Sequence, residues 1–209
     1  MSYIFENWDV VFGYTLEHLS LVGQALAIAL LFALPVGVAV SRVRWLATGV
    51  LAVLGIIYTV PSLALLGFLI PFTGLGSGTL LIALVAYAQV TLVRNITLAF
   101  NGIDPAVVEA AKGMGMNGWQ RLYRVEFPLA LPVIFAGVRV TVLLLVGLAT
   151  IGGWVAAGGL GRLLYTSLKT DDLNGVLAAA LMLSLLAILA DQLFRTIERF
   201  SRRDLLVRP

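Results

Sequence analysis

Long runs of apolar residues, separated by short polar stretches, set the pattern of this 209-residue chain. Four stretches contain no charged residue: 19–41, 45–93, 140–161 and 173–190. A helix needs about 20 apolar residues to cross the roughly 30 Å hydrocarbon core of a membrane, so these runs are long enough to span it. The pattern therefore predicts an all-α integral membrane protein.

Five transmembrane helices account for these runs, because the longest run divides in two. Proline, glycine and serine in the stretch PFTGLGSG, residues 71–78, favour a turn over a continued helix. A chain of this length is expected to form a single transmembrane domain, residues 1–209. The predicted helices cover residues 19–40, 46–70, 79–100, 129–151 and 173–194.

The basic residues predict the orientation, because Lys and Arg of short loops stay on the cytoplasmic side. An outside N-terminus and an inside C-terminus leave only Arg162 and Lys169 outside, with Arg94 close to the inner side. Residues 101–128 then form a cytoplasmic loop between the third and fourth helices. The basic residues gathered inside are Arg42, Arg44, Lys112, Arg121, Arg124, Arg195, Arg199, Arg202, Arg203 and Arg208.

Composition narrows the possible chemistry. Residues are 60% hydrophobic and only 12% charged, which is outside the range of ordinary soluble domains. The absence of cysteine excludes disulfides and thiolate metal sites, and the single histidine, His18, is expected at the membrane interface rather than in a metal or proton site. No G-x-x-x-x-G-K-[ST] motif occurs, so the chain cannot bind and hydrolyse ATP by itself.

The polar loop carries signals for a first short helix. Asp104 is a suitable N-cap, and Pro105 follows at the first helical position, where its missing N–H costs nothing. The helix is expected to end near Gly113–Met114–Gly115, where one of the two glycines takes the left-handed conformation.

A second short helix is expected to follow, with Asn117 and Gln120 as a capping box and Pro128 closing the element. The first helix exposes small and apolar side chains that have no partner in the predicted cytoplasmic part of this chain. Such a surface fits docking into a groove of a soluble partner, and the alternative is a solvated connector between two spans. The candidate docking residues are Val107, Glu109, Ala110, Ala111, Gly113, Met114 and Gly115.

The spacing of the loop resembles the EAA signature of the permease subunits of ABC importers. It reads Glu109-Ala110-Ala111, three residues, Gly115, nine residues, Val125, one residue, then Phe127-Pro128. The resemblance implies a type I ABC importer permease fold in a bacterial or archaeal plasma membrane, with residues 104–127 as a coupling loop to an ATPase. It also implies a second permease chain, identical or similar, and an extracytoplasmic substrate-binding protein. ATP and magnesium would be bound by the ATPase partner, and no cofactor is expected on this chain.

Further segments resemble the branch that imports osmoprotectants such as glycine betaine, carnitine and choline. They include TVPSLALLGFLIP (59–71), LVRNI (92–96) and LATIGGWVAAGGLG (148–161). A permease for an amino acid such as methionine shares the size and topology and is the first alternative. A secondary transporter is less favoured, because such carriers place carboxylates at mid-membrane, and a scaffold without transport leaves the loop unexplained.

Side chains of moderate polarity within the spans are candidates for the transport path or its gate, with helix packing as the alternative for each. Arg139 is the basic residue well inside the fourth helix, where an unpaired charge is costly. We expect it to pair with Asp191 of the fifth helix, the alternatives being extension toward the cytoplasm or a place in the pore. The candidates are Tyr58, Ser62, Tyr87, Gln89, Asn95 and Arg139.

Overall fold

A computed structural model describes the backbone of residues 2–206 and the side chains of residues 3–201. Every regular element in that part is helical, which confirms the all-α prediction. The side chains of Arg202, Arg203 and Arg208, which the orientation argument used, lie outside the described residues. The helices are α1 (Ser2–Glu6), α2 (Trp8–Arg42), α3 (Arg44–Thr59), α4 (Ser62–Thr73), α5 (Ser77–Asn101), α6 (Pro105–Gly113), α7 (Gly118–Arg121), α8 (Phe127–Ala149), α9 (Gly159–Lys169) and α10 (Leu173–Leu206), with a π-helical turn (Leu122–Glu126) and a 3-10 turn (Thr150–Val155).

Four helical segments are long and apolar enough to cross a membrane. They are α2, α5, the continuous segment Gly118–Val155 that contains α8, and α10. A fifth span results if the bent pair α3 and α4 is counted as one. Two predicted spans are longer than expected: α2 begins at Trp8 rather than at residue 19, and α10 continues beyond residue 194.

The predicted second span, 46–70, is wrong as a single helix. It breaks into α3 and α4, whose axes differ by 97°. Pro61 causes the break, because proline lacks the N–H for a helical hydrogen bond and drives the residue before it, Val60, into an extended conformation. The Tyr87 hydroxyl donates to the freed Val60 carbonyl at 2.5 Å, so the broken backbone keeps a partner inside the bundle.

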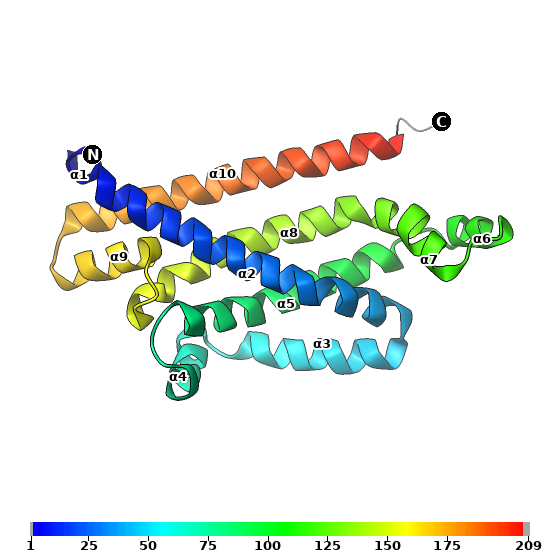
Figure 1. Ribbon diagram of the computed structural model, residues 1–209, viewed down its shortest axis with the longest axis horizontal. Helices are drawn as coiled ribbons and strands as arrows, with labels where there is room; N and C mark the ends of the chain where they lie inside the picture. Colours follow the sequence, from blue (N-terminus) through cyan, green and yellow to red (C-terminus); the bar gives the residue numbers. More distant parts are fainter. Residues whose placement is uncertain (1, 207–209) are drawn as a thin grey trace.

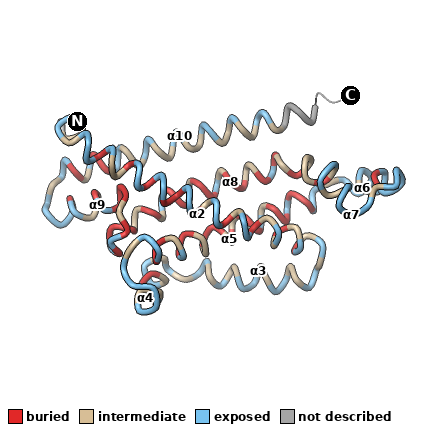
Figure 2. The backbone as a smooth tube through the Cα atoms, viewed as in Figure 1, coloured by how far each residue is buried: buried red, intermediate tan, exposed pale blue. Residues whose placement is uncertain are grey.

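The core lies where α2, α5 and α8 pack together, and Figure 2 shows buried positions concentrated along these three helices. Small residues let α2 approach α5 closely: Ala25, Ala29 and Ala33 are fully buried. A Cβ atom added to Gly37 would lie 2.5 Å from a methyl carbon of Ile96. By contrast, α3 contains no fully buried residue: one side packs partly against the core through residues such as Leu51 and Leu54, and the other side is exposed.

The two ends of the bundle differ in what they carry. In Figure 1, α1 and α9 lie at one end of the long axis, and α6 and α7 lie at the other. The C-terminal half of α10 extends toward the end that carries α6 and α7. We call the two ends the α9 end and the EAA end, and we call residues 104–127 the EAA loop.

Candidate functional site

The first helix of the EAA loop begins and ends as its sequence predicts. The Asp104 side chain accepts a hydrogen bond from the N–H of Ala106 at 2.8 Å, and Pro105 occupies the first helical position. At the other end, the N–H of Met116 bonds to the Ala111 carbonyl, while Gly115 takes a φ of +78°. This six-to-one bond with a left-handed glycine terminates the helix. Of the two glycines proposed for the turn, Gly115 therefore makes it.

The second helix has the predicted start but not the predicted end. Asn117 and Gln120 form a reciprocal capping box with both hydrogen bonds at 2.9 Å. The prediction that Pro128 closes the element is wrong, because α7 runs through the π-helical turn directly into α8. Pro128 stands within the first two positions of α8, directly after the π-helical turn, and it does not end the helix. The second EAA helix is thus a rigid extension of a long apolar helix.

The predicted docking residues form an exposed face on α6, with one exception. Val107 and Met114 are 39% and 69% exposed, and Glu109, Ala110, Gly113 and Gly115 are exposed as well. Ala111 is buried, because α6 folds back on α7 and the π-helical turn. The expectation that Ala111 belongs to the free surface is therefore wrong, and its role is to seat α6.

Two aromatic residues that were not among the predicted docking residues are also exposed at the EAA end. Trp119 and Tyr123 are 69% and 63% exposed, and their rings stack with centroids 5.7 Å apart. Their spacing of four residues along a helix was the available signal, since such pairs share a helix face. Together with α6 they give the EAA end an apolar and aromatic surface.

A buried carboxylate ties the EAA loop to α2. Glu126 is 2% exposed, and its Oε1 accepts a hydrogen bond from Arg121 Nε at 2.8 Å. Its Oε2 pairs with Arg42, the last residue of α2. Two cations thus neutralise one buried anion, which is the condition under which a carboxylate is tolerated away from water. Through this cluster the π-helical turn, α7 and the joint between α2 and α3 are held together.

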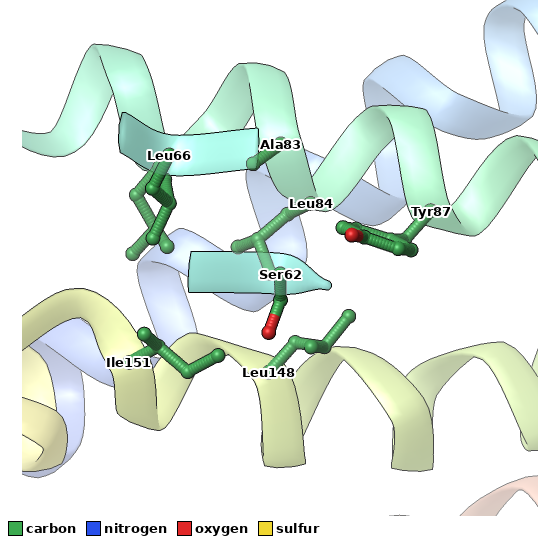
Figure 3. Close-up of a pocket in the computed structure, with 8 residues that line it drawn as sticks. Ser62, Leu66, Ala83, Leu84, Tyr87, Leu148 and Ile151 are labelled. Atoms are coloured by element: carbon green, nitrogen blue, oxygen red, sulfur yellow. The ribbon is translucent and has the colours of Figure 1, made fainter. Parts of the chain in front are cut away.

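Two of the residues predicted for the transport path, Ser62 and Tyr87, line one small internal cavity (Figure 3). Its volume is about 10 Å³, roughly the space of a single water molecule, and the rest of its wall is apolar. In Figure 3 the Ser62 side chain of α4 points toward Leu148 of α8. The cavity lies where α4 meets α5 and α8, and in this conformation it has room for about one water molecule.

Tyr58 and Asn95 share a larger hollow between α3 and α5. Its volume is about 330 Å³, and Gly55, Val90, Thr91 and Arg94 complete the lining. Arg94 was not among the residues predicted for the path. Its position next to Asn95 in the sequence could have indicated that Arg94 also lines the hollow.

Gln89 and Arg139 line neither of these two spaces but form contacts between helices. Gln89 donates to the Ala29 carbonyl at 3.0 Å, which links α5 to α2. Arg139 Nε lies 2.5 Å from Asp191 Oδ1, and Arg195 lies 2.8 Å from the other oxygen of the same carboxylate. The predicted pairing of Arg139 with Asp191 is confirmed, and it joins α8 to α10.

The prediction that His18 lies at the membrane interface is wrong, because its side chain is fully buried. Its Nε2 lies 3.2 Å from the Val146 carbonyl, and its neighbour Glu17 accepts a hydrogen bond from the N–H of Gly159 at 2.8 Å. Gly159, the first residue of α9, leaves room for His18, because a Cβ atom there would lie 3.2 Å from the His18 Cα. A Cβ atom on Gly153 would collide with the Gly161 carbonyl oxygen, so the 3-10 turn and α9 can approach this closely only because glycine has no side chain.

Comparison with known proteins identifies the family of this fold. Residues 25–203 match the family described as "Binding-protein-dependent transport system inner membrane component", and the chain belongs to that family. The chain is 39% identical over 203 residues to the osmoprotectant import permease protein OsmW of Salmonella typhimurium, covering 95% of this chain and 94% of the relative. It is 33% identical to the glycine betaine/carnitine/choline transport system permease protein OpuCB of Bacillus subtilis, covering 95% and 92%.

Solved structures agree on the fold. An inward-facing structure of the MetNI methionine ABC transporter contains a chain that superposes with a TM-score of 0.85 at 26% identity, covering 91% of this chain and 95% of that one. A crystal structure of an amino acid ABC transporter with histidines superposes with a TM-score of 0.78 at 16% identity, covering 94% and 96%. The chain therefore has the type I ABC permease fold and is an inner-membrane protein.

Proposed function

We propose, from the membership of this chain in the binding-protein-dependent permease family, that it is the membrane-spanning subunit of an ATP-driven importer for an osmoprotectant such as glycine betaine, carnitine or choline. The observation that carries the proposal is the transport function for which two relatives, OsmW and OpuCB, are named; both align over almost the whole chain. The capped EAA loop supports it, since an importer without its own nucleotide site needs a place where energy enters.

The EAA loop is the coupling element in this proposal. Its exposed α6 face, around Val107, Glu109 and Met114, docks into a groove of a separate ATPase, which binds ATP and magnesium. Because α7 continues into α8, a displacement of the loop is transmitted along a helix that reaches the α9 end. Such transmission suits a rocking of rigid elements between inward-open and outward-open states.

The proposed orientation has the N-terminus outside and the C-terminus inside, with five spans when α3 and α4 count as one. Basic side chains support it, because α6 and α7 carry Lys112 and Arg121, and α2 ends at Arg42. Cysteine labelling tests it well in a chain without native cysteine. We expect labels at Ser2 and Thr170 to react from outside and a label at Asn117 to react only from inside; equal access at Ser2 and Asn117 contradicts it.

A complete importer in this proposal contains a second permease chain, two ATPase subunits and an extracytoplasmic substrate-binding protein. The unburied side chains of α3 and α4 support a second chain or a solute path on that face. Val53, Ile56 and Phe68 there are each more than half exposed in the single chain. Faces of this size and apolarity are covered by lipid or protein.

Uptake by the reconstituted importer tests the function. The permease, its ATPase and its binding protein are placed in proteoliposomes, and uptake of labelled glycine betaine, carnitine, choline and methionine is measured with and without ATP. We expect ATP-dependent uptake of at least one quaternary amine and none of methionine. Uptake of methionine alone favours the amino-acid alternative, and uptake that is independent of ATP contradicts an ATP-driven importer.

A further inference from the structure

The hollow between α3 and α5 contains an unpaired cation. Arg94 lies seven residues before the end of α5 at Asn101, which is about 10 Å along the helix axis. It forms no ion pair with any residue in the described part of the chain. After Arg44, helices α3 and α4 carry no charge at all. A cation on an apolar helix is costly unless it faces water or an anionic partner, so Arg94 indicates a place that a solute or water occupies.

The rest of the lining offers a second kind of contact. Tyr58, on α3, is 52% exposed, and its ring meets the ring of Tyr87 edge-on with centroids 6.3 Å apart. Because the Tyr87 hydroxyl is bound to the Val60 carbonyl, Tyr87 is a fixed support for Tyr58. An aromatic ring held at the wall of a hollow attracts a quaternary ammonium group through its π electrons.

Asn95 is held in place by the bundle. Its Nδ2 donates to the Thr91 carbonyl at 2.8 Å, and a Cβ atom on Gly137 of α8 would lie 2.5 Å from the Asn95 Cβ. The glycine therefore leaves room for the amide beside Arg94. None of the six residues that line the hollow is acidic, and the volume of about 330 Å³ is at the small end of ligand sites.

We propose that this hollow is a transient binding site for a small zwitterion with a carboxylate and a quaternary ammonium group, an assignment that rests on the proposed import of osmoprotectants. Arg94 binds the carboxylate, for which a guanidinium offers paired donors. Tyr58 contacts the ammonium group. Glycine betaine and carnitine carry both groups, whereas choline carries only the cation. The site therefore distinguishes between them, because Arg94 binds the carboxylate of the zwitterions and has no favourable contact with choline.

The test compares zwitterion and cation uptake in the complete importer in proteoliposomes. We expect Arg94→Gln to lower glycine betaine uptake by about tenfold or more, the effect of losing a charge-assisted hydrogen bond, while choline uptake stays within about threefold. Arg94→Lys should retain part of the betaine uptake. Tyr58→Leu should lower the uptake of both solutes, and Tyr58→Phe should preserve both. Permease level and basal ATP hydrolysis show that each variant is assembled.

If the importer moves only one of the two solutes, their uptake cannot be compared, and a labelling measurement tests the site instead. The chain has no cysteine, so Thr91→Cys places a single thiol in the hollow, and Thr48→Cys, on the exposed face of α3, is its control. We expect glycine betaine to slow labelling at Thr91 more than choline does, with no effect of either solute at Thr48, and Arg94→Gln to reduce the protection by glycine betaine to the level that choline gives. Equal losses of betaine and choline uptake in Arg94→Gln, or protection by glycine betaine that is unchanged in it, overturn the site. A wild-type importer that moves none of glycine betaine, carnitine and choline overturns the proposed function instead.

Discussion

Replacement of Glu126 by glutamine should separate the EAA loop from α2. The carboxylate is buried at 2% exposure and receives Arg121 at 2.8 Å and Arg42 on its other oxygen. Glutamine keeps the size and one acceptor oxygen but removes the negative charge. Two guanidinium groups then face each other across a neutral amide, so the cluster changes from a net charge of +1 to +2.

The cost of this change follows from the exposure of the two arginine side chains. A hydrogen bond to a charged group contributes about 1.5–3 kcal/mol, and Arg121, at 19% exposure, should lose most of that value. Arg42 is 40% exposed and can turn to solvent, so its share is close to that of a surface pair, about 0–1 kcal/mol. We expect Glu126→Gln to lower the free energy of unfolding by about 2–3 kcal/mol, which for a chain of this size is a fall of roughly 4–12 °C in Tm.

Thermal unfolding of the purified permease in detergent measures this loss, with Glu6→Gln on the exposed side of α1 as the charge-matched control. We also expect binding-protein-stimulated ATP hydrolysis to fall, because the loop no longer holds the end of α2. A double-mutant cycle with Arg121→Gln isolates the pair. The reasoning is refuted if the two losses add within about 0.5 kcal/mol, since contacting residues should couple by more than that.

Three further changes probe other contacts. Gly115→Val should strain a backbone with φ of +78° by about 1–3 kcal/mol and uncouple ATP hydrolysis from transport at a normal permease level. Its control is Gly113→Ala, at a position where φ is ordinary and space is open, which should lower neither the stability nor the level of the permease. Arg139→Ala and Asp191→Ala should each reduce the amount of folded permease, and the double replacement should be less harmful than the sum; strict additivity would exclude the pair. Tyr87→Phe should cost about 1–3 kcal/mol by leaving the carbonyl at the α3–α4 break without a donor, and unchanged thermal unfolding would show that water replaces the hydroxyl.

Local chemistry along the chain was sufficient to predict the helices and the EAA loop. Hydrophobic length alone sets which segments can span a membrane, and this predicted α2, α5, α8 and α10. The caps at Asp104 and Asn117 and the turn at Gly115 depend on residues within five positions of one another, so the sequence contains everything that decides them. The EAA spacing is a local signal of the same kind.

Only the tertiary structure decided the contacts, burial and ion pairs between helices that are distant in the sequence. The bend at Pro61 could be expected, but its size and the partner of its free carbonyl depend on where α5 places Tyr87. Burial of His18 and Ala111, and the pairing of Glu126 with Arg42 across 84 residues, likewise follow from packing that no local pattern encodes. The hollow at Arg94 is lined by residues of both α3 and α5, so a residue that reads as an interfacial arginine in the sequence becomes part of the wall of the proposed site. The physical reason is the same in each case: hydrophobic length and capping act within one helix, whereas burial, ion pairing and cavities depend on the relative placement of several.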